Sequence, residues 1–365
     1  MTFLKDVVQS AGTPAEKGKI NIIMKKTAIF ILLTLCANIC LCQRSSLKHY
    51  YYWINQAELA ICDSNYQKAS DCYDKAFSCR KPFSAHAYLA FKVNSKYTHN
   101  NDRASECFHY LVMSGDSIQW YAEDSLMYSD LWPILQKVAD TTTSMVIPEL
   151  RQALIDIRNS DQRVRRRTYS EDESWEDSLL ITDSLNMVKL LELYKTYPVI
   201  DDYTTGSTDM NPAFCYHIAK EFLFDPAQIF YPEVLKGNVN ASQYATTEDV
   251  CLDFIQSVKG ESPKTRYGTT SSQFFILDTI GFVLEPENLK EVTKERKKIL
   301  LSETWNDYAK KVAYRYQHET DFYLVRTTNL YYPPEEAEQI IKETITGIDN
   351  GLIKGSYYII PEKLR

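Results

Sequence analysis

The sequence contains little glycine and lacks the short motifs of several common catalytic sites. Eleven glycines in 365 residues are few for a glycine-punctuated β-sandwich or a nucleotide-binding α/β fold. No H-E-x-x-H or G-x-S-x-G segment occurs, so neither a zinc-protease helix nor a hydrolase nucleophile elbow is supported. No C-x-x-C pair occurs, which leaves a zinc knuckle or a thioredoxin-type redox site without support. We expect no metal and no cofactor.

The chain also lacks a long basic stripe, and its net charge is −7 at pH 7. One basic cluster, at 163–167, is followed by an acidic run at 171–177, and the two runs neutralise each other across a solvated loop. Neutralisation of phosphates supplies most of the affinity of nucleic-acid-binding proteins. We therefore expect no nucleic acid partner.

Residues 24–42 have the organisation of a signal peptide, with two lysines, an apolar run and then small residues. The apolar run covers only 28–35, whereas a membrane span needs ~20 residues, so we expect no membrane span in the mature chain. Residues 1–23 are expected to reflect a mis-assigned upstream start. Cleavage before Gln43 removes five basic and two acidic side chains and leaves a net charge of −10. The predicted location is the periplasm or cell envelope of a Gram-negative-type bacterium, with a lipoprotein as the rival interpretation.

Six cysteines remain after that cleavage. They are Cys62, Cys72, Cys79, Cys107, Cys215 and Cys251. An exported protein permits disulfides, and an even count fits them. Burial as small apolar residues is an equal alternative, because four of the six fall on helices expected in the first domain.

The composition favours a mainly α fold with two domains. Twenty-six tyrosines are many, and helical-repeat proteins use aromatic residues between stacked helices. A change in sequence texture near 140–148 divides the mature chain into a helical domain at 43–140 and an α-rich domain at 148–365 with a small β-hairpin.

Residues 53–82 carry the spacing of alanines and aromatics that brings two helices close together. The expected packing residues are Trp53, Ala57, Ala60, Ala69, Tyr73 and Ala76. A weaker copy at 85–115 has Tyr88, Ala104, Phe108 and Leu111 at equivalent offsets. The segment 50–115 thus resembles tetratricopeptide repeats, which implies a concave face that binds a protein partner. The alternative is a scaffold that only packs against the second domain.

The second domain is expected to contain a series of helices and one hairpin. Leu150, Leu154 and Ile157 mark one apolar face, and Leu185, Val188, Leu191 and Leu193 provide apolar positions of the next helix. Asn211 and Pro212 begin a further helix, and a threonine at 246–247 caps another that ends at Gly260. A hairpin turns at 278–281, a long helix covers 287–316, and a last helix runs from Pro334 to Gly347.

The order of polar motifs over 150–310 resembles an uncharacterised bacterial domain family. Its matching positions are Asp161, Gln162, Arg163, Asp183, Asn186, Pro198, His217, Arg266, Tyr267, Gly268, Thr269 and Arg296. The chain departs from the family where 196–198 read T-Y-P in place of G-W-P, and His217 lacks its usual glutamine and acidic companions. The resemblance implies a domain and not a reaction.

Two groups of these residues could form a site. Gly268 permits a special backbone conformation, and Arg266 with Thr269 could hold an anion or a sugar hydroxyl. The alternative is a turn whose arginine pairs with Asp161 or Asp183. The further ligand-binding candidates are Tyr267, Asp161, Arg163 and Asn186.

His217 and Glu221 lie four residues apart on a predicted helix and would share one face. They could act as a general base with its orienting carboxylate, with Asp183 as a third catalytic candidate. A helix-surface pair is the alternative. The sequence leads us to expect a non-enzymatic protein-interaction or scaffold module. The alternative is a hydrolase-like enzyme, or a protein that binds a small ligand or carbohydrate, with His217 as base and Arg266 and Tyr267 positioning the substrate.

Overall fold

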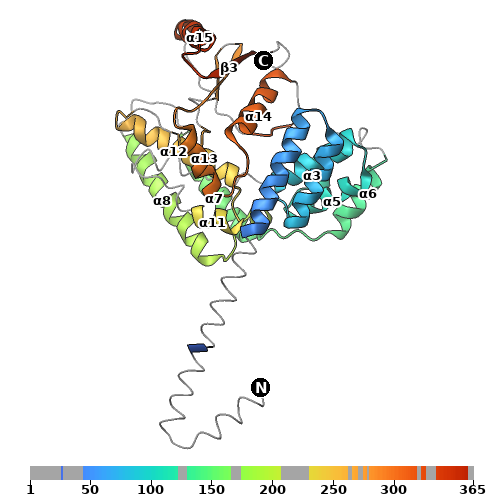
Figure 1. Ribbon diagram of the computed structural model, residues 1–365. Helices are drawn as coiled ribbons and strands as arrows, with labels where there is room; N and C mark the ends of the chain where they lie inside the picture. Colours follow the sequence, from blue (N-terminus) through green and yellow to red (C-terminus); the bar gives the residue numbers. More distant parts are fainter. Residues whose placement is uncertain are drawn as a thin grey trace, which may run out of the picture. The chain divides into compact units, whose positions relative to one another are not determined.

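The computed structural model describes residues 26–27, 44–121, 130–165, 174–206, 230–261, 265–269, 274–277, 279–318, 322–325 and 334–360. Residues 1–46 and residues 47–365 form two compact units. The described residues are mainly α-helical with one small antiparallel sheet, which confirms the predicted fold class (Figure 1). The predicted signal peptide and its cleavage site lie almost wholly outside the described residues and stay predictions.

Two helical hairpins come first in the 47–365 unit. Their helices are a helix over 44–62, α3 (Tyr66–Cys79), α4 (Ser84–Lys92) with its π-helical extension η1 (Val93–Tyr97), and α5 (Asn101–Met113). An asparagine begins the second helix of each hairpin. Asn65 accepts a hydrogen bond from the N–H of Lys68, and Asn100 accepts one from the N–H of Arg103. Each side chain satisfies a backbone donor that the first helical turn leaves free.

The residues expected to pack the hairpins together lie in the core. Those that are fully buried are Ala57, Ala60, Ala69, Tyr73 and Ala76. Trp53 is half-buried and carries the Lys75 ammonium 4.5 Å above its ring centroid. Small side chains at such positions let helix backbones approach closely. Membership of the repeat family itself stays a prediction.

The hairpins are joined to later parts of the chain by one continuous hydrophobic core. The ring of Phe322 lies 5.4 Å from that of Tyr97, which stacks on Tyr66 at 4.0 Å. The Tyr51 hydroxyl accepts a 2.9 Å hydrogen bond from the N–H of Ala241. These contacts pack part of the hairpin surface against later parts of the chain.

The next helices are η2 (Ile118–Tyr121), α6 (Trp132–Thr141), α7 (Pro148–Arg165) and α8 (Ser174–Thr196), and α7 packs beside α8 (Figure 1). The apolar face predicted for α7 is confirmed, because Leu150, Leu154 and Ile157 are buried. Of the apolar positions named for α8, Leu185 and Val188 are exposed, and the opposite side of the helix is buried.

Three further helices follow, and one of them corrects a predicted cap. They are α9 (Asp202–Thr205), α11 (Tyr231–Lys236) and α12 (Ala241–Val258). The cap of α12 is Asn240, whose side chain accepts hydrogen bonds from Ser242 and Gln243. The predicted threonine cap is wrong, because Thr246 and Thr247 lie inside the helix and their hydroxyls donate to carbonyls one turn earlier. Gly260 follows the end of α12 at φ +69°, as predicted.

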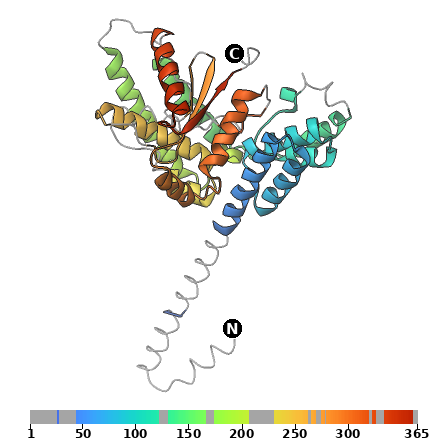
Figure 2. The ribbon, with the colours of Figure 1, turned by 45° about the horizontal axis from the view of Figure 1, so that its top comes forward.

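The sheet consists of β1 (Phe274–Leu277), β2 (Ile280–Leu284) and β3 (Gly355–Ile359), all antiparallel. The predicted hairpin is confirmed as β1 and β2, whereas β3 was not predicted. One face of the sheet packs on α14 (Trp305–Gln317) and the other on α15 (Pro334–Asp349) (Figure 2). Gly281 lets the Tyr316 ring approach, because a Cβ there would lie 2.5 Å from that ring.

The single long helix predicted over 287–316 is wrong. Helix α13 (Leu289–Lys298) ends before Leu300, which has φ +66°. Helix α14 then starts from a new cap at Thr304, which exchanges hydrogen bonds with Asp307. The capping box separates two helices that hydrophobic periodicity alone would join.

None of the cysteines at Cys62, Cys72, Cys79, Cys107 and Cys251 is disulfide-bonded. Cys72, Cys107 and Cys251 are buried among apolar residues, as the burial alternative expects. Cys215 lies outside the described residues.

Candidate functional site

The loop at 265–269 folds around the carboxylate of Asp249, a residue of α12. Asp249 accepts hydrogen bonds from the N–H groups of Arg266, Tyr267 and Thr269 at 2.7, 2.9 and 2.8 Å. The hydroxyls of Thr265 and Thr269 donate to it at 2.7 and 2.8 Å. The Thr269 hydroxyl, one of the groups predicted to hold an external anion, is therefore engaged by an internal carboxylate.

Burial shapes the electrostatics of this loop. It raises the pKa of Asp249, while the hydrogen bonds from the loop oppose that shift. Gly268 has φ +73°, and its N–H donates to the Thr265 hydroxyl. The loop is thus a structural turn, which was one of the two interpretations of the sequence. Asp249 itself was not singled out, although it lies one helical turn after the buried Ala245.

The expected partners of Arg266 were wrong. Arg266 forms an ion pair with the fully buried carboxylate of Glu248. Asp161 and Asp183 instead bind Arg165, at 2.9 and 2.6 Å. The two carboxylates expected to meet the loop thus join α7 to α8.

The remaining candidates are scattered over several elements. Arg163 is exposed on α7, Asn186 is buried on α8 with no hydrogen bond to its side-chain oxygen, and Tyr267 and Thr269 are buried in the loop. His217 and Glu221 lie outside the described residues. A site that joins His217 and Glu221 to Asp183 or Arg266 therefore stays a prediction.

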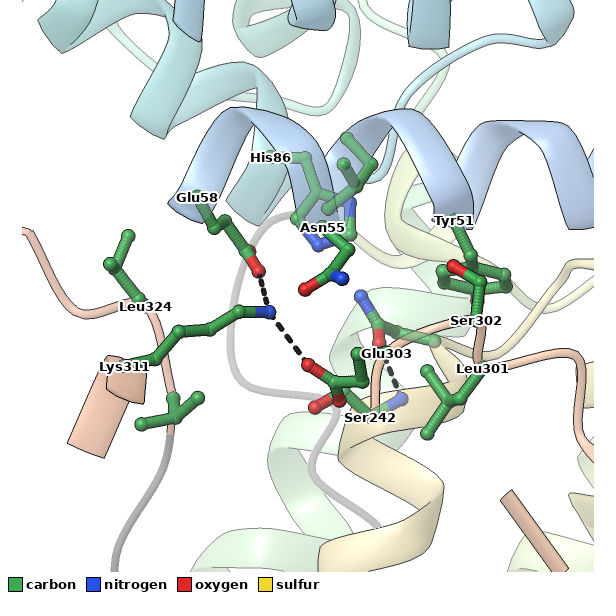
Figure 3. Close-up of a pocket in the computed structure, with 13 residues that line it drawn as sticks. Tyr51, Asn55, Glu58, His86, Ser242, Leu301, Ser302, Glu303, Lys311 and Leu324 are labelled. Carbon is green, nitrogen blue, oxygen red and sulfur yellow. Dashed lines mark hydrogen bonds and ion pairs between the residues drawn. The ribbon is translucent and has the colours of Figure 1, made fainter. Parts of the chain in front are cut away.

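The structure brings together a cluster of four buried charges, of which the sequence analysis named only Arg296, as a position of the resembled family. Lys311 of α14 lies between two carboxylates, with its Nζ 2.5 Å from Glu58 and 2.6 Å from Glu303 (Figure 3). Arg296 of α13 pairs with the other carboxylate oxygen of Glu303. Arg296 also donates a 2.7 Å hydrogen bond to the carbonyl oxygen of Tyr267. The cluster therefore connects the 44–62 helix, α13, α14 and the loop that encloses Asp249.

The two carboxylates of this cluster differ in their electrostatics. Burial raises the pKa of Glu58, and Lys311 only partly offsets that effect. Burial also acts on Glu303, but the two cations Lys311 and Arg296 outweigh it and lower the pKa of Glu303. For Lys311 the desolvation by burial is outweighed by both carboxylates, so its pKa is raised. The two positive and two negative side chains neutralise one another.

Charged residues at core positions were the signal for this cluster. Glu58 lies one turn after Ile54 and three residues before Ile61, on the buried side of its helix. Lys311 lies between the buried Tyr308 and Val312 of α14. Periodicity assigns both positions to the interior, so each charge needs a partner there.

A small polar cavity adjoins the cluster, with a volume of about 40 Å³. That is room for roughly three water molecules and well below the size of a metabolite pocket. The side-chain oxygen of Asn55 and the hydroxyl of Ser302 line it without a hydrogen-bond partner in the described structure. The amide nitrogen of Asn55 donates to Asp307 at 3.1 Å. A polar cavity of this size is large enough for water to hydrogen-bond such oxygens.

His86 also lines the cavity. Burial lowers the pKa of His86 to about 3, so its ring is neutral, and its Nδ1 lies 2.7 Å from the Tyr50 hydroxyl. The Lys311 ammonium is engaged by Glu58 and Glu303. The cluster is suited to holding helices together.

Comparisons with family models, with curated proteins and with solved structures found no match to this chain. The resemblances to tetratricopeptide repeats and to an uncharacterised bacterial domain therefore stay predictions. Among the described residues, no group of three metal-ligating side chains is placed to hold an ion. No helix in the described ranges is both long and apolar enough to cross a bilayer.

Proposed function

We propose that this chain is a non-enzymatic protein-interaction module of the cell envelope. In this proposal the hairpins stabilise the fold by docking on later parts of the chain, and α8 contacts a helix of another protein. The contact surface is the set Ile181, Leu185 and Val188, here called the α8 stripe. Its exposure is the observation that carries the proposal.

The α8 stripe lies on one side of a helix whose other side is buried. Ile181, Leu185 and Val188 are 59%, 54% and 53% exposed, and their i, i+4, i+7 spacing places them on one face. The residues buried on the opposite side are Leu179, Met187 and Leu190. A helix that is apolar on two sides normally buries both sides against other elements. The exposed α8 stripe therefore supports a second contact.

The chemistry around the α8 stripe favours an amphipathic protein helix as its partner. Three apolar residues over two turns match the i, i+3 or i+4, i+7 anchors by which helices pack. The exposed charges beyond Val188 are of both signs, at Lys189, Glu192 and Lys195. A helix that lies on a lipid surface carries a predominantly basic polar face. A protein helix with mixed charges therefore fits better than a membrane.

The proposed location rests on the signal-peptide pattern at 24–42. Export would place the α8 stripe where it meets envelope proteins. Mass spectrometry of the protein isolated from the cell that makes it tests this point, with Gln43 expected as the first residue. A mature chain that retains residues 24–42 would contradict export by this route.

Site-specific photo-crosslinking tests the contact itself. A photoreactive amino acid replaces Leu185 in one variant and Arg158, an exposed residue of the neighbouring helix α7, in the matched control. The proposal predicts one protein adduct from position 185 that is absent at position 158. Peptide mapping should place the adduct on a helix of that protein with apolar residues at i, i+3 or i+4, and i+7.

Other outcomes would overturn the proposal. The same adducts from both positions would show that the contact is non-specific, and adducts with lipid alone would identify a membrane surface. If position 185 formed no adduct at all, the evidence for a partner helix would be lost.

A further inference from the structure

The strand β3 lies at the edge of the sheet. The strand order is β1-β2-β3, and β3 pairs with β2 without interruption from Gly355 opposite Leu284 to Ile359 opposite Ile280. Its other edge is therefore open to pairing with a further strand. This edge is remote in sequence from the α8 stripe.

The hydrogen bonds that flank the ladder identify the backbone groups at the open edge. The N–H of Ile360 donates to the carbonyl of Thr279, and the N–H of Glu285 donates to the carbonyl of Lys354, each at 2.8 Å. Hydrogen-bonded positions alternate along an antiparallel pair, so Ser356 and Tyr358 face β2. The outward groups belong to Gly355, Tyr357 and Ile359, for which the described structure shows no backbone partner beyond β2.

Nothing within β3 protects this edge. The strand reads Gly-Ser-Tyr-Tyr-Ile, with no charged residue, no proline and no bulge. Folded proteins usually shield an edge strand with one of these features. Ile359 is 72% exposed and Tyr357 is 36% exposed, so the strand also presents apolar surface to solvent.

We propose that β3 pairs with β3 of a second copy of this chain, antiparallel across a two-fold axis at Tyr357. In this register each outward residue of one copy meets an outward residue of the other, with Tyr357 opposite Tyr357 and Gly355 opposite Ile359. Each such pair exchanges both of its backbone hydrogen bonds. The two sheets become one continuous sheet.

The side chains of β3 are self-complementary in this register. Ile359, which is exposed, lies beside Gly355, which has no side chain to obstruct it. Lys354 faces Ile360, so no like charges are brought together. A two-fold contact of one surface with itself closes without forming a fibre, which suits a strand that lacks edge protection. A second copy therefore fits this edge better than an unrelated peptide.

Disulfide trapping tests the pairing and its register. Tyr357→Cys places two cysteines opposite one another with a Cα separation of about 5.5 Å, inside the disulfide range of about 4.4–6.8 Å. Ile359→Cys is the matched control, because its two copies would lie about 13 Å apart along the strands. The proposal predicts that oxidised Tyr357→Cys forms a dimer above the wild-type background, whereas Ile359→Cys does not.

Sedimentation velocity of the full chain measures the association without cysteines. Tyr357→Pro removes an outward N–H and should weaken dimerisation by roughly tenfold or more. Tyr357→Thr keeps that N–H and should still dimerise. Ile359→Lys provides a second variant should the proline disturb the strand, and circular dichroism checks the fold of each.

A monomeric wild type at the highest soluble concentration would overturn the proposal. Equal trapping of the cysteine variants at 357 and 359 would overturn the register. If dimers still form in both Tyr357→Pro and Ile359→Lys, the interface lies elsewhere. If β3 pairs only with an added extended peptide, its partner is a strand of another protein and not a second copy of this chain.

Discussion

The ammonium group of Lys311 lies 2.5 Å from a carboxylate oxygen of Glu58, although the two residues are 253 positions apart in the chain. The contact joins the first helix of the 47–365 unit to α14. Because both side chains are buried, neither can exchange its partner for bulk water.

Removal of the Lys311 charge should destabilise the fold strongly. Lys311→Met leaves Glu58 and Glu303 buried without their shared cation, and we expect a loss of about 3–5 kcal/mol in the free energy of unfolding. Urea denaturation measures this loss. Lys310→Met is the matched control, because Lys310 forms an exposed pair with Asp63 that should contribute less than about 1 kcal/mol.

A double variant separates the charge imbalance from lost packing. Glu58→Gln combined with Lys311→Met leaves the Arg296–Glu303 pair neutral, so it should be more stable than Lys311→Met alone. Equal losses for the variants at Lys310 and Lys311 would contradict the account of the cluster.

The buried His86 should make stability depend on pH in the acid range. Its pKa is lowered from an ordinary 6.5 to about 3, so below pH 6.5 the unfolded chain takes up a proton that the folded protein does not. The free energy of unfolding should therefore fall as the pH falls from 6.5 towards 3, by up to about 1.4 kcal/mol per pH unit from this residue. Chemical denaturation at several pH values should show a shallower slope for His86→Gln than for wild type. If the free energy of unfolding changed equally with pH in the wild type and in His86→Gln, His86 would contribute nothing to the pH dependence.

Asp249 should be essential to the loop at 265–269. Asp249→Asn keeps the shape but presents an amide that cannot accept all the hydrogen bonds from the loop, and we expect a loss of roughly 3 kcal/mol or more. Hydrogen exchange of the N–H groups of Arg266, Tyr267 and Thr269 should become faster. Asp253→Asn, one turn further along α12, should leave their exchange unchanged. The same exchange rates in both variants would refute the role of Asp249.

Gly281 should tolerate no side chain while Tyr316 is present. A Cβ at position 281 would lie 2.5 Å from the tyrosine ring, so Gly281→Ala should lower stability by about 1–3 kcal/mol. Tyr316→Leu should reduce the cost of adding that methyl group. Thermal unfolding of the single and double variants measures the coupling, and strictly additive effects would contradict the contact.

The sequence predicted features that depend on neighbouring residues and missed those that depend on distant ones. The apolar face of α7 and the stop at Gly260 followed from periodicity and glycine chemistry. The strand β3 could not be predicted, because its partner β2 lies far earlier in the chain and its own five residues show no buried alternation. The periodic residues on both sides of Leu300 concealed the break between α13 and α14.

The candidate site shows the same division. Arg266 and Thr269 were recognised as anion-binding groups, but their anions are carboxylates of the same chain, Glu248 for the Arg266 side chain and Asp249 for the Thr269 hydroxyl. Lys311 and Glu58 were missed because each is an ordinary charged residue until its burial is known. The periodic apolar pattern of α8 was recognised, yet no pattern could show that Leu185 and Val188 face outward.

The central claim is that the α8 stripe binds a partner helix, and a binding titration tests it most directly. Calorimetry would compare wild type, Leu185→Asp and the α7 control Arg158→Asp against the purified protein identified by crosslinking. We predict that Leu185→Asp abolishes binding while its free energy of unfolding changes by less than about 0.5 kcal/mol, and that Arg158→Asp binds as wild type does. Unchanged binding by Leu185→Asp, or its loss only together with the fold, would contradict the account.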